Sequence, residues 1–170
     1  MKIMHVVGAR PSFVKVAPVA AIMRRFPDVF EQVLVHTGHH YDKVMSAAFC
    51  QQLGLPDANE FLTVGGGSHS QQTARVMASF EEAVLRHRPD WIMVAGDVNS
   101  TLGSAVVSAR FGIKVAHLDP GLQSRTMPDQ ISRILADHLS DLLITPSLDV
   151  SATELNAVPD PGGIRFVGMS

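Results

Sequence analysis

Residues 114–141, KVAHLDPGLQSRTMPDQISRILADHLSD, decide the fold that we predict for this chain. A short apolar run over Val115–Leu118 ends at Asp119, a turn containing proline and glycine follows, and an amphipathic run extends to Leu139. A short apolar block followed by apolar residues at helical spacing is typical of a strand and then a helix. The stretch therefore predicts one strand–loop–helix unit.

Charged side chains gather where this strand and this helix meet. The stretch holds two carboxylates and two cations there: Asp119, Asp129, Arg125 and Arg133. Open sheets of parallel strands bind their ligands at the carboxyl ends of the strands. We therefore expect this loop to contribute to a ligand site at that edge of a sheet.

The same alternation runs through the whole chain. Apolar runs predict strands over Ile3–Val7, Val33–Val35, Phe61–Val64, Trp91–Ala95, Val115–Leu118, Leu142–Ile144 and Ile164–Val167. Periodic stretches predict helices over about Pro11–Met23, Asp42–Leu53, Ser70–His87, Thr101–Phe111, Pro128–Leu139 and Leu148–Asn156. This spacing predicts an α/β fold with a doubly wound, mostly parallel sheet, in a single domain of residues 1–170.

Proline, glycine and other small residues add local expectations. Pro18 should kink the first helix because it lacks an N–H, and Pro27 should end that helix. The run Gly65–Gly67 predicts a flexible loop before the long helix. Gly103 and the two small residues after it should let their helix pack closely on the sheet.

The bulk composition describes an ordinary globular domain. The chain has 170 residues, 46% of them apolar and 18% charged, with a net charge of −2, which gives no sign of a non-specific nucleic-acid surface. A single cysteine, Cys50, excludes an internal disulfide framework, and its apolar helical context predicts a buried, inert thiol. No signal peptide and no transmembrane run are recognisable, so we expect a cytoplasmic protein.

The first strand leads into Gly8-Ala9-Arg10-Pro11. A cation beside a helix amino terminus suits an anionic group such as a phosphate or a carboxylate. Lys15 follows one turn further along the same predicted helix. The alternative is that both cations are solvated surface residues. The pattern is neither the glycine fingerprint of a dinucleotide site nor a Walker P-loop.

Asp97 follows the fourth predicted strand, where an aspartate is often a helix cap; its place on the same edge as Asp119 favours a catalytic role. Several histidines are expected in two loops of this edge, at spacings that match no standard zinc pattern: His36, His39, His40 and His69. His117 lies inside a strand, and we expect it to be a core histidine with satisfied hydrogen bonds. No serine lies in a nucleophile-elbow context.

Six motifs, spaced in order along nearly the whole chain, are recognisable together. They are Gly8–Pro11 with Lys15, Thr37–Asp42, Gly67–His69 with Gln72–Ala74, Gly96–Thr101, Ala116–Leu122 and Arg125–Pro128. They closely resemble the amino-terminal domain of the non-hydrolysing UDP-N-acetylglucosamine 2-epimerases. The resemblance implies the Rossmann-like half of a GT-B fold, without the carboxyl-terminal domain that carries most of the uridine diphosphate site.

The resemblance implies interconversion of UDP-N-acetylglucosamine and UDP-N-acetylmannosamine in cell-surface polysaccharide biosynthesis, by elimination of UDP and its re-addition. Such chemistry needs a base for the C2 proton and cations for the departing diphosphate, and no metal or other cofactor. The matching acid/base candidates are Asp97, Asp119 and Asp129. The matching cations are Arg10, Lys15 and Arg133, and His40 matches a histidine of a regulatory UDP-sugar site in some members.

A rival interpretation is a truncated or degenerate module that binds a sugar nucleotide weakly or only associates with a partner. Asp119 and Asp129 stand where the family has glutamates, which shortens their reach by about 1.5 Å. A misplacement of ~1 Å can cost on the order of 100-fold in rate. These changes and the absent half favour the rival, whereas the retained Arg10, Lys15 and Asp97 favour an enzyme.

Members of the family are usually dimers through helices of this domain. We therefore expect a homodimer, with candidate contacts on two helices at Met45, Phe49, Met77 and Phe80. The alternative, above all for Phe80, is that these side chains pack on the sheet. Without a second domain, Leu118, Leu122 and Met127 are also expected to form open apolar surface at the ligand edge.

Overall fold

The computed structural model describes residues 1–38, 48, 50–118, 127–145 and 164–166. The strands are β1 (Lys2–Val7), β2 (Glu31–His36), β3 (Glu60–Phe61), β4 (Trp91–Ala95), β5 (Lys114–Leu118), β6 (Leu142–Thr145) and β7 (Ile164–Phe166). The helices are α1 (Arg10–Met23), α3 (His69–His87), α4 (Asn99–Arg110) and α5 (Met127–His138). Residues 48 and 50–52 are helical within the second predicted helix, and the helix predicted at 148–156 lies outside the described residues.

The strands form one seven-stranded sheet in the order β3-β2-β1-β4-β5-β6-β7, and each recorded pairing is parallel. The chain runs outward from β1 to β3, returns to β4 on the other side of β1, and continues to β7. The direction of winding therefore reverses between β1 and β4. This arrangement confirms the doubly wound α/β fold, and its switch point is where such sheets bind ligands.

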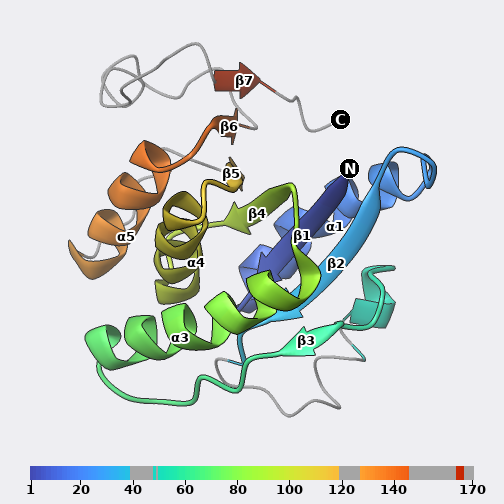
Figure 1. Cartoon of the computed structure of the whole chain (residues 1–170). Helices are drawn as coiled ribbons and strands as arrows, with labels where there is room; N and C mark the ends of the chain where they lie inside the picture. Colours follow the sequence, from blue (N-terminus) through green and yellow to red (C-terminus); the bar gives the residue numbers. More distant parts are fainter. Residues whose placement is uncertain (39–47, 49, 119–126, 146–163, 167–170) are drawn as a thin grey trace.

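Alternate side chains of the strands build two cores, as expected for a sheet buried on both faces. On one face, Met4, Val6 and Ile92 pack with residues of α3, α4 and α5. On the other face, Ile3, Val7 and Met93 pack with residues of α1. Figure 1 shows α3, α4 and α5 side by side along one face of the sheet, with α1 on the opposite side.

The loop before α1 is closed by Ser12. Its Oγ donates to the carbonyl of Ala9 at 2.6 Å and accepts the N–H groups of Gly8 at 3.1 Å and Ala9 at 3.2 Å. Ser12 is the third residue of the helix, and its hydroxyl reaches back to the N–H of the N-cap residue Ala9, as the N3 residue of a capping box does. The helix continues through Pro18 and ends at Met23, as the periodic stretch predicts. Pro27 lies four residues beyond that end, so it does not itself end the helix.

The region around β3 departs from the prediction of a strand over Phe61–Val64. The strand is shorter because Thr63 has a φ of 48°, which turns the backbone out of an extended course. The loop at Gly65–Gly67 is anchored: Nε of Arg75 donates to the carbonyl of Val64 at 2.8 Å and its Nη2 to that of Gly66. Gln72 also donates to Gly67, so the expected free loop is tied to α3.

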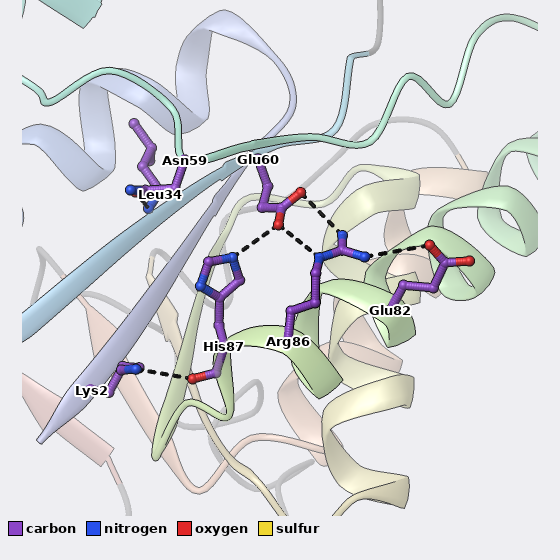
Figure 2. A network of polar contacts seen from close by, with 7 residues as sticks. All are labelled: Lys2, Leu34, Asn59, Glu60, Glu82, Arg86 and His87. Atoms are coloured by element: carbon purple, nitrogen blue, oxygen red, sulfur yellow. Dashed lines mark hydrogen bonds and ion pairs between the residues drawn. The ribbon is translucent and has the colours of Figure 1, made fainter.

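A polar network joins the edge strand β3 to the end of α3 (Figure 2). The carboxylate of Glu60 accepts from Nε and Nη2 of Arg86 at 2.9 and 3.1 Å, and its Oε1 lies 3.0 Å from Nε2 of His87. Arg86 lowers the pKa of Glu60, opposed by partial burial, with His87 adding to the lowering. Lys2 donates to the carbonyl of His87 at 3.1 Å, which connects the network to β1.

Several packing predictions need correction. Phe80 is fully buried, so it cannot serve as the expected dimer contact. Met77 packs partly buried against the same core, and its part in a dimer stays a prediction. Leu118 belongs to the core between the sheet and α1 rather than to an open surface, because its side chain lies on the face of the sheet that α1 covers. Gly103 meets Val76 of α3, not the sheet. Met45, Phe49 and Leu122, and the side chain of Met127, lie outside the description.

None of the helices in the described part of the chain is long and apolar enough to cross a membrane.

Candidate functional site

Three loops converge at the carboxyl edge of β1. A Cβ placed on Gly8 would lie 2.6 Å from Oγ1 of Thr37, which follows β2, and 2.6 Å from Oγ of Ser100, in the first turn of α4. A side chain would fit here only if both hydroxyls moved away, so the arrangement as it stands suits glycine. The hydroxyl of Thr37 is buried and has no hydrogen-bond partner in the structure. The loops after β1, β2 and β4 are therefore in direct contact.

Lys15 lies over the turn that follows β4. Its Nζ is 3.9 Å from the point where a Cβ on Gly96 would be, and Gly96 itself has a φ of +80°. Asp97 comes next, half-buried, ahead of the amino terminus of α4. The N-cap of α4 is Val98, so Asp97 is not the N-cap residue that the alternative interpretation expected. The cation on α1 and the carboxylate after β4 thus share the switch point.

His117 connects this turn to α5. Its Nε2 lies 2.8 Å from the carbonyl oxygen of Gly96, and its Nδ1 lies 2.6 Å from Oδ1 of Asp137. The ring is fully buried. The prediction of a core histidine with satisfied hydrogen bonds is confirmed, and the partners show that it joins the end of β4 to α5.

A second polar chain links the starts of α3 and α4. Nδ1 of His69 lies 3.1 Å from Oδ1 of Asn99, and the amide of Asn99 donates to Gln72 at 2.8 Å. His36 is not in a loop as expected. It is the last residue of β2, its ring is buried, and the rings of Phe13 and Phe61 lie 5.4 and 5.5 Å from it.

The remaining candidate residues are distributed as follows. Arg10 is exposed at the first position of α1. Asp129 lies in the first turn of α5, and Arg133 one turn later, both half-buried. The other candidates of this edge lie outside the described residues: His39, His40, Asp119 and Arg125.

Cys50 is buried and free, as expected. Burial, reinforced by the charge of Asp57, raises the pKa of its thiol, which makes a reactive thiolate unfavourable. No group of three metal-ligating side chains occurs within the described ranges.

The geometry of the described edge suits an anionic ligand that reacts by proton transfer. Lys15 supplies a positive charge, Asp97 supplies a carboxylate without a hydrogen bond or ion pair to another described residue, and α4 directs its amino terminus to the same edge. A carboxylate of this kind can accept a proton while the cation stabilises a leaving anion.

Sequence reasoning missed the contacts that assemble the site. Gly8 is part of a recognisable motif, but its role depends on Thr37 and Ser100, which are remote in the chain. The sequence gives only a weak hint that Asp137 lies near the site. It is four residues after Arg133, and so one turn further along the same helix. Its contact with His117 follows only from the packing of α5 beside β5.

Comparison with known proteins gives one family. A family model described as UDP-N-acetylglucosamine 2-epimerase matches residues 23–169. A UDP-N-acetylglucosamine 2-epimerase homolog of Methanococcus maripaludis is 44% identical over 149 residues, which are 86% of this chain and 41% of that protein. A UDP-2,3-diacetamido-2,3-dideoxy-D-glucuronate 2-epimerase of Pseudomonas aeruginosa is 39% identical over 150 residues, which are 86% of this chain and 42% of that protein.

A solved structure is similar over almost the whole chain. It is the UDP-GlcNAc 2-epimerase of Methanocaldococcus jannaschii in complex with UDP-GlcNAc and UDP, with a TM-score of 0.90 and 32% sequence identity. The match covers 99% of this chain and 46% of that protein. The chain thus spans less than half the length of the relatives that it matches.

Proposed function

Because the chain belongs to the UDP-N-acetylglucosamine 2-epimerase family, we propose that it forms the amino-terminal, catalytic half of an enzyme that interconverts UDP-N-acetylglucosamine and UDP-N-acetylmannosamine. A companion nucleotide-binding half, as in the longer relatives, would supply most of the site for uridine diphosphate. The proposal places this enzyme in the cytoplasm and in the synthesis of cell-surface polysaccharide. It requires no cofactor and no metal.

The reaction proceeds in two balanced steps. A carboxylate removes the proton at C2 of the sugar, the C2–H electron pair forms a double bond to C1, and UDP leaves with the electrons of the C1–O bond. The UDP oxygen then adds back to C1 while a proton returns to the opposite face of C2. The two faces of C2 call for proton donors and acceptors on both sides of the sugar ring.

The residues of the switch point take the chemical roles. Asp97, Asp119 and Asp129 are the acid/base candidates, of which Asp97 lies two residues after the end of β4. Lys15, Arg10 and Arg133 stabilise the negative charge that develops on the departing diphosphate and orient it. His40 is a candidate for a second, regulatory UDP-sugar site.

The observation that carries the proposal is the approach of Lys15 to the Gly96–Asp97 turn, with Nζ 3.9 Å from the Cβ position of Gly96. A cation and a carboxylate held at one switch point are what an elimination of UDP needs. A surface pair of solvated cations would not have one member half-buried over this turn, as Lys15 is. Nε2 of His117 contacts the carbonyl oxygen of Gly96 in the same turn.

The second candidate is a non-catalytic module that binds a sugar nucleotide or a partner. It is favoured by one specific observation, the two aspartates at the glutamate positions, Asp119 and Asp129. The two candidates differ in what they do to bound UDP-N-acetylglucosamine. The enzyme converts it, whereas the module leaves it unchanged.

The deciding experiment follows the sugar by proton NMR. The 170-residue chain is assayed with UDP-N-acetylglucosamine alone, and then with the carboxyl-terminal half of the Methanocaldococcus jannaschii enzyme added or fused. We expect UDP-N-acetylmannosamine only when the companion half is present, and loss of that product in Asp97→Asn. The sugar nucleotide named for the Pseudomonas relative is the second substrate to test. Binding of UDP-N-acetylglucosamine without conversion would favour the module.

The proposal includes a homodimer through helices of this domain. With Phe80 in the core and Met77 packed partly buried against it, Leu85 is the large apolar side chain that α3 leaves most open to solvent, at 56%. Light scattering at micromolar concentration should return twice the mass of one chain, and Leu85→Asp should reduce it. A single-chain mass for the unmodified protein would contradict the dimer.

A further inference from the structure

We propose that His117 is a positioning residue for Asp97, and that Asp137 keeps its ring in the doubly protonated imidazolium form. This role rests on the proposed function, because it presumes that Asp97 takes part in catalysis. The protonation state does not rest on it, since it follows from the contacts of the ring and from the ordinary basicity of imidazole.

Both ring nitrogens of His117 face oxygen atoms. Nε2 lies 2.8 Å from the carbonyl oxygen of Gly96, and a carbonyl can only accept, so Nε2 must carry a proton. Nδ1 lies 2.6 Å from Oδ1 of Asp137, a distance that requires a proton between them. A neutral imidazole has one N–H and would leave one of these contacts without a proton. The two contacts therefore need two protons, one on Nε2 and one between Nδ1 and Oδ1 of Asp137. We assign the second to the ring, because an imidazole is ordinarily more basic than a carboxylate.

Asp137 is the charged partner of the ring that the described part of the chain shows. The ring of His117 is fully buried. The side chain of Asp137 is 13% exposed. The buried residues of α4, which packs on this face of the sheet, are all uncharged: Ser100, Thr101, Gly103, Ser104, Ala105, Val107 and Ser108. An imidazolium and a carboxylate in contact form a pair without net charge, which is the form that such a site tolerates.

The position of the pair connects three elements of the candidate site. The carbonyl that His117 binds belongs to Gly96, whose peptide bond leads directly into Asp97. The N–H of Gly96 donates to the carbonyl of Leu118 at 3.4 Å, which is longer than the 2.8 Å between the Gly96 carbonyl and the ring of His117. Asp137 lies on α5, one turn beyond Arg133 and two beyond Asp129.

His117 therefore orients the Gly96–Asp97 peptide relative to α5. It does so through two hydrogen bonds in a buried setting, where a charged donor binds more strongly than a neutral one. It touches none of the reacting atoms. An aspartate that orients a histidine, which in turn orients a third group, is a known way of holding geometry in enzyme sites.

The test is a nitrogen NMR spectrum of the histidine rings in the ¹⁵N-labelled 170-residue chain at pH 7. We expect both nitrogens of His117 to carry protons, with couplings that place one beside the Asp137 carboxylate. A His117 ring with a bare Nδ1 would overturn the proposal, wherever the second proton lies. No substrate or companion half is needed, so this result and the outcome of the epimerase assay are independent.

Two matched variants test the positioning role. Asp137→Asn should remove the Nδ1 proton of His117 and shift the backbone amide resonances of Gly96 and Asp97. Asp141→Asn alters another carboxylate of the same region, which accepts from the N–H of Val115 at 2.8 Å, and should leave both signals in place. If the amide of Asp97 does not move when the Nδ1 proton is lost, the ring does not position it. Should Asp137→Asn fail to fold, the spectrum of the unmodified chain still decides the protonation state.

Discussion

Val76 of α3 lies directly against Gly103 of α4. A Cβ on Gly103 would be 2.8 Å from Cγ1 of Val76 and 3.3 Å from the carbonyl oxygen of Thr73. The two helices approach so closely at this point that a hydrogen atom is the largest side chain that fits. This contact fixes the spacing of the helical layer, and with it the amino terminus of α4 at the ligand edge.

Gly103→Ala should therefore destabilise the domain by about 1–3 kcal/mol, because the added methyl group forces the helices apart. Urea unfolding followed by circular dichroism measures the change. Val76→Ala in the same chain should recover part of the loss by removing the atoms that clash. The control is Gly66→Ala, since a Cβ at Gly66 meets nothing within 4 Å. Equal stability of Gly103→Ala and the unmodified chain would refute the close approach.

Gly8→Ala should disrupt the junction of the three loops. The new methyl group would be 2.6 Å from the hydroxyls of both Thr37 and Ser100, so both hydroxyls must turn away or the loops after β1, β2 and β4 must separate. We expect a loss of about 1–3 kcal/mol in the free energy of unfolding, as for other overpacked sites. Amide shifts should concentrate at Thr37, Gly96 and Ser100. Shifts spread evenly over the chain would argue against a local junction.

His5 should make the stability of the domain depend on pH. Burial lowers its pKa from 6.5 to about 4, opposed by the hydrogen bond with Gln32. The unfolded chain binds a proton at His5 below about pH 6.5, whereas the folded ring stays neutral until about pH 4. The contribution of His5 is complete above pH 6.5 and is lost as the pH falls toward 4, by up to about 3 kcal/mol.

Unfolding in urea at pH 7, 5.5 and 4.5 measures this dependence. His5→Asn cannot titrate in this range and should show a shallower loss of stability than the unmodified chain. His138→Asn, an exposed histidine at the end of α5, is the control and should keep the original slope. Identical slopes for His5→Asn and the unmodified chain would contradict the neutral, buried ring.

Glu60→Gln should loosen the edge strand β3. The change removes the charge that binds Arg86 and His87 while keeping the size of the side chain. Faster hydrogen exchange at the amide of Leu62, which donates to the carbonyl of His36 at 2.9 Å, would report the loss. In the unmodified chain this protection should persist above the ordinary glutamate pKa of 4.5 and fall in more acidic solution, because the folded-state pKa of Glu60 is lowered. Glu82→Gln, a more exposed partner of Arg86 at 3.6 Å, should have little effect.

Most of the fold could be predicted from the sequence because each strand is an apolar block and each helix has a clear period. The bounds of β4 were predicted to the residue, and those of β5 to within one. β3 was predicted too long because nothing local announces the positive φ of Thr63. The sequence could not decide whether Phe80 packs in the core or forms a dimer contact. An apolar residue at helical spacing fits either role, and only the position of the helix on the sheet shows that Phe80 is buried.

The candidate site was predictable only in outline. The carboxyl ends of the strands marked where Asp97 and Lys15 would lie, because parallel strands bring their ends to one edge. The contacts between the loops could not be predicted in this way, because they join residues from distant parts of the chain. Thr37, Ser100 and Gly8 are far apart in the chain and touch only once β1 is placed between β2 and β4. The partner of His117 likewise depends on how α5 packs, which periodicity does not specify.

We propose that Asp97 and its neighbours perform an epimerisation through loss of the C2 proton. It is tested most directly by incubating UDP-N-acetylglucosamine in D₂O with the chain joined to its companion half, and following C2 by NMR. We predict that deuterium replaces the C2 proton in both epimers, and that Asp97→Asn slows this exchange by at least about 100-fold. Sugar nucleotide that binds the same protein and keeps its C2 proton would contradict the account.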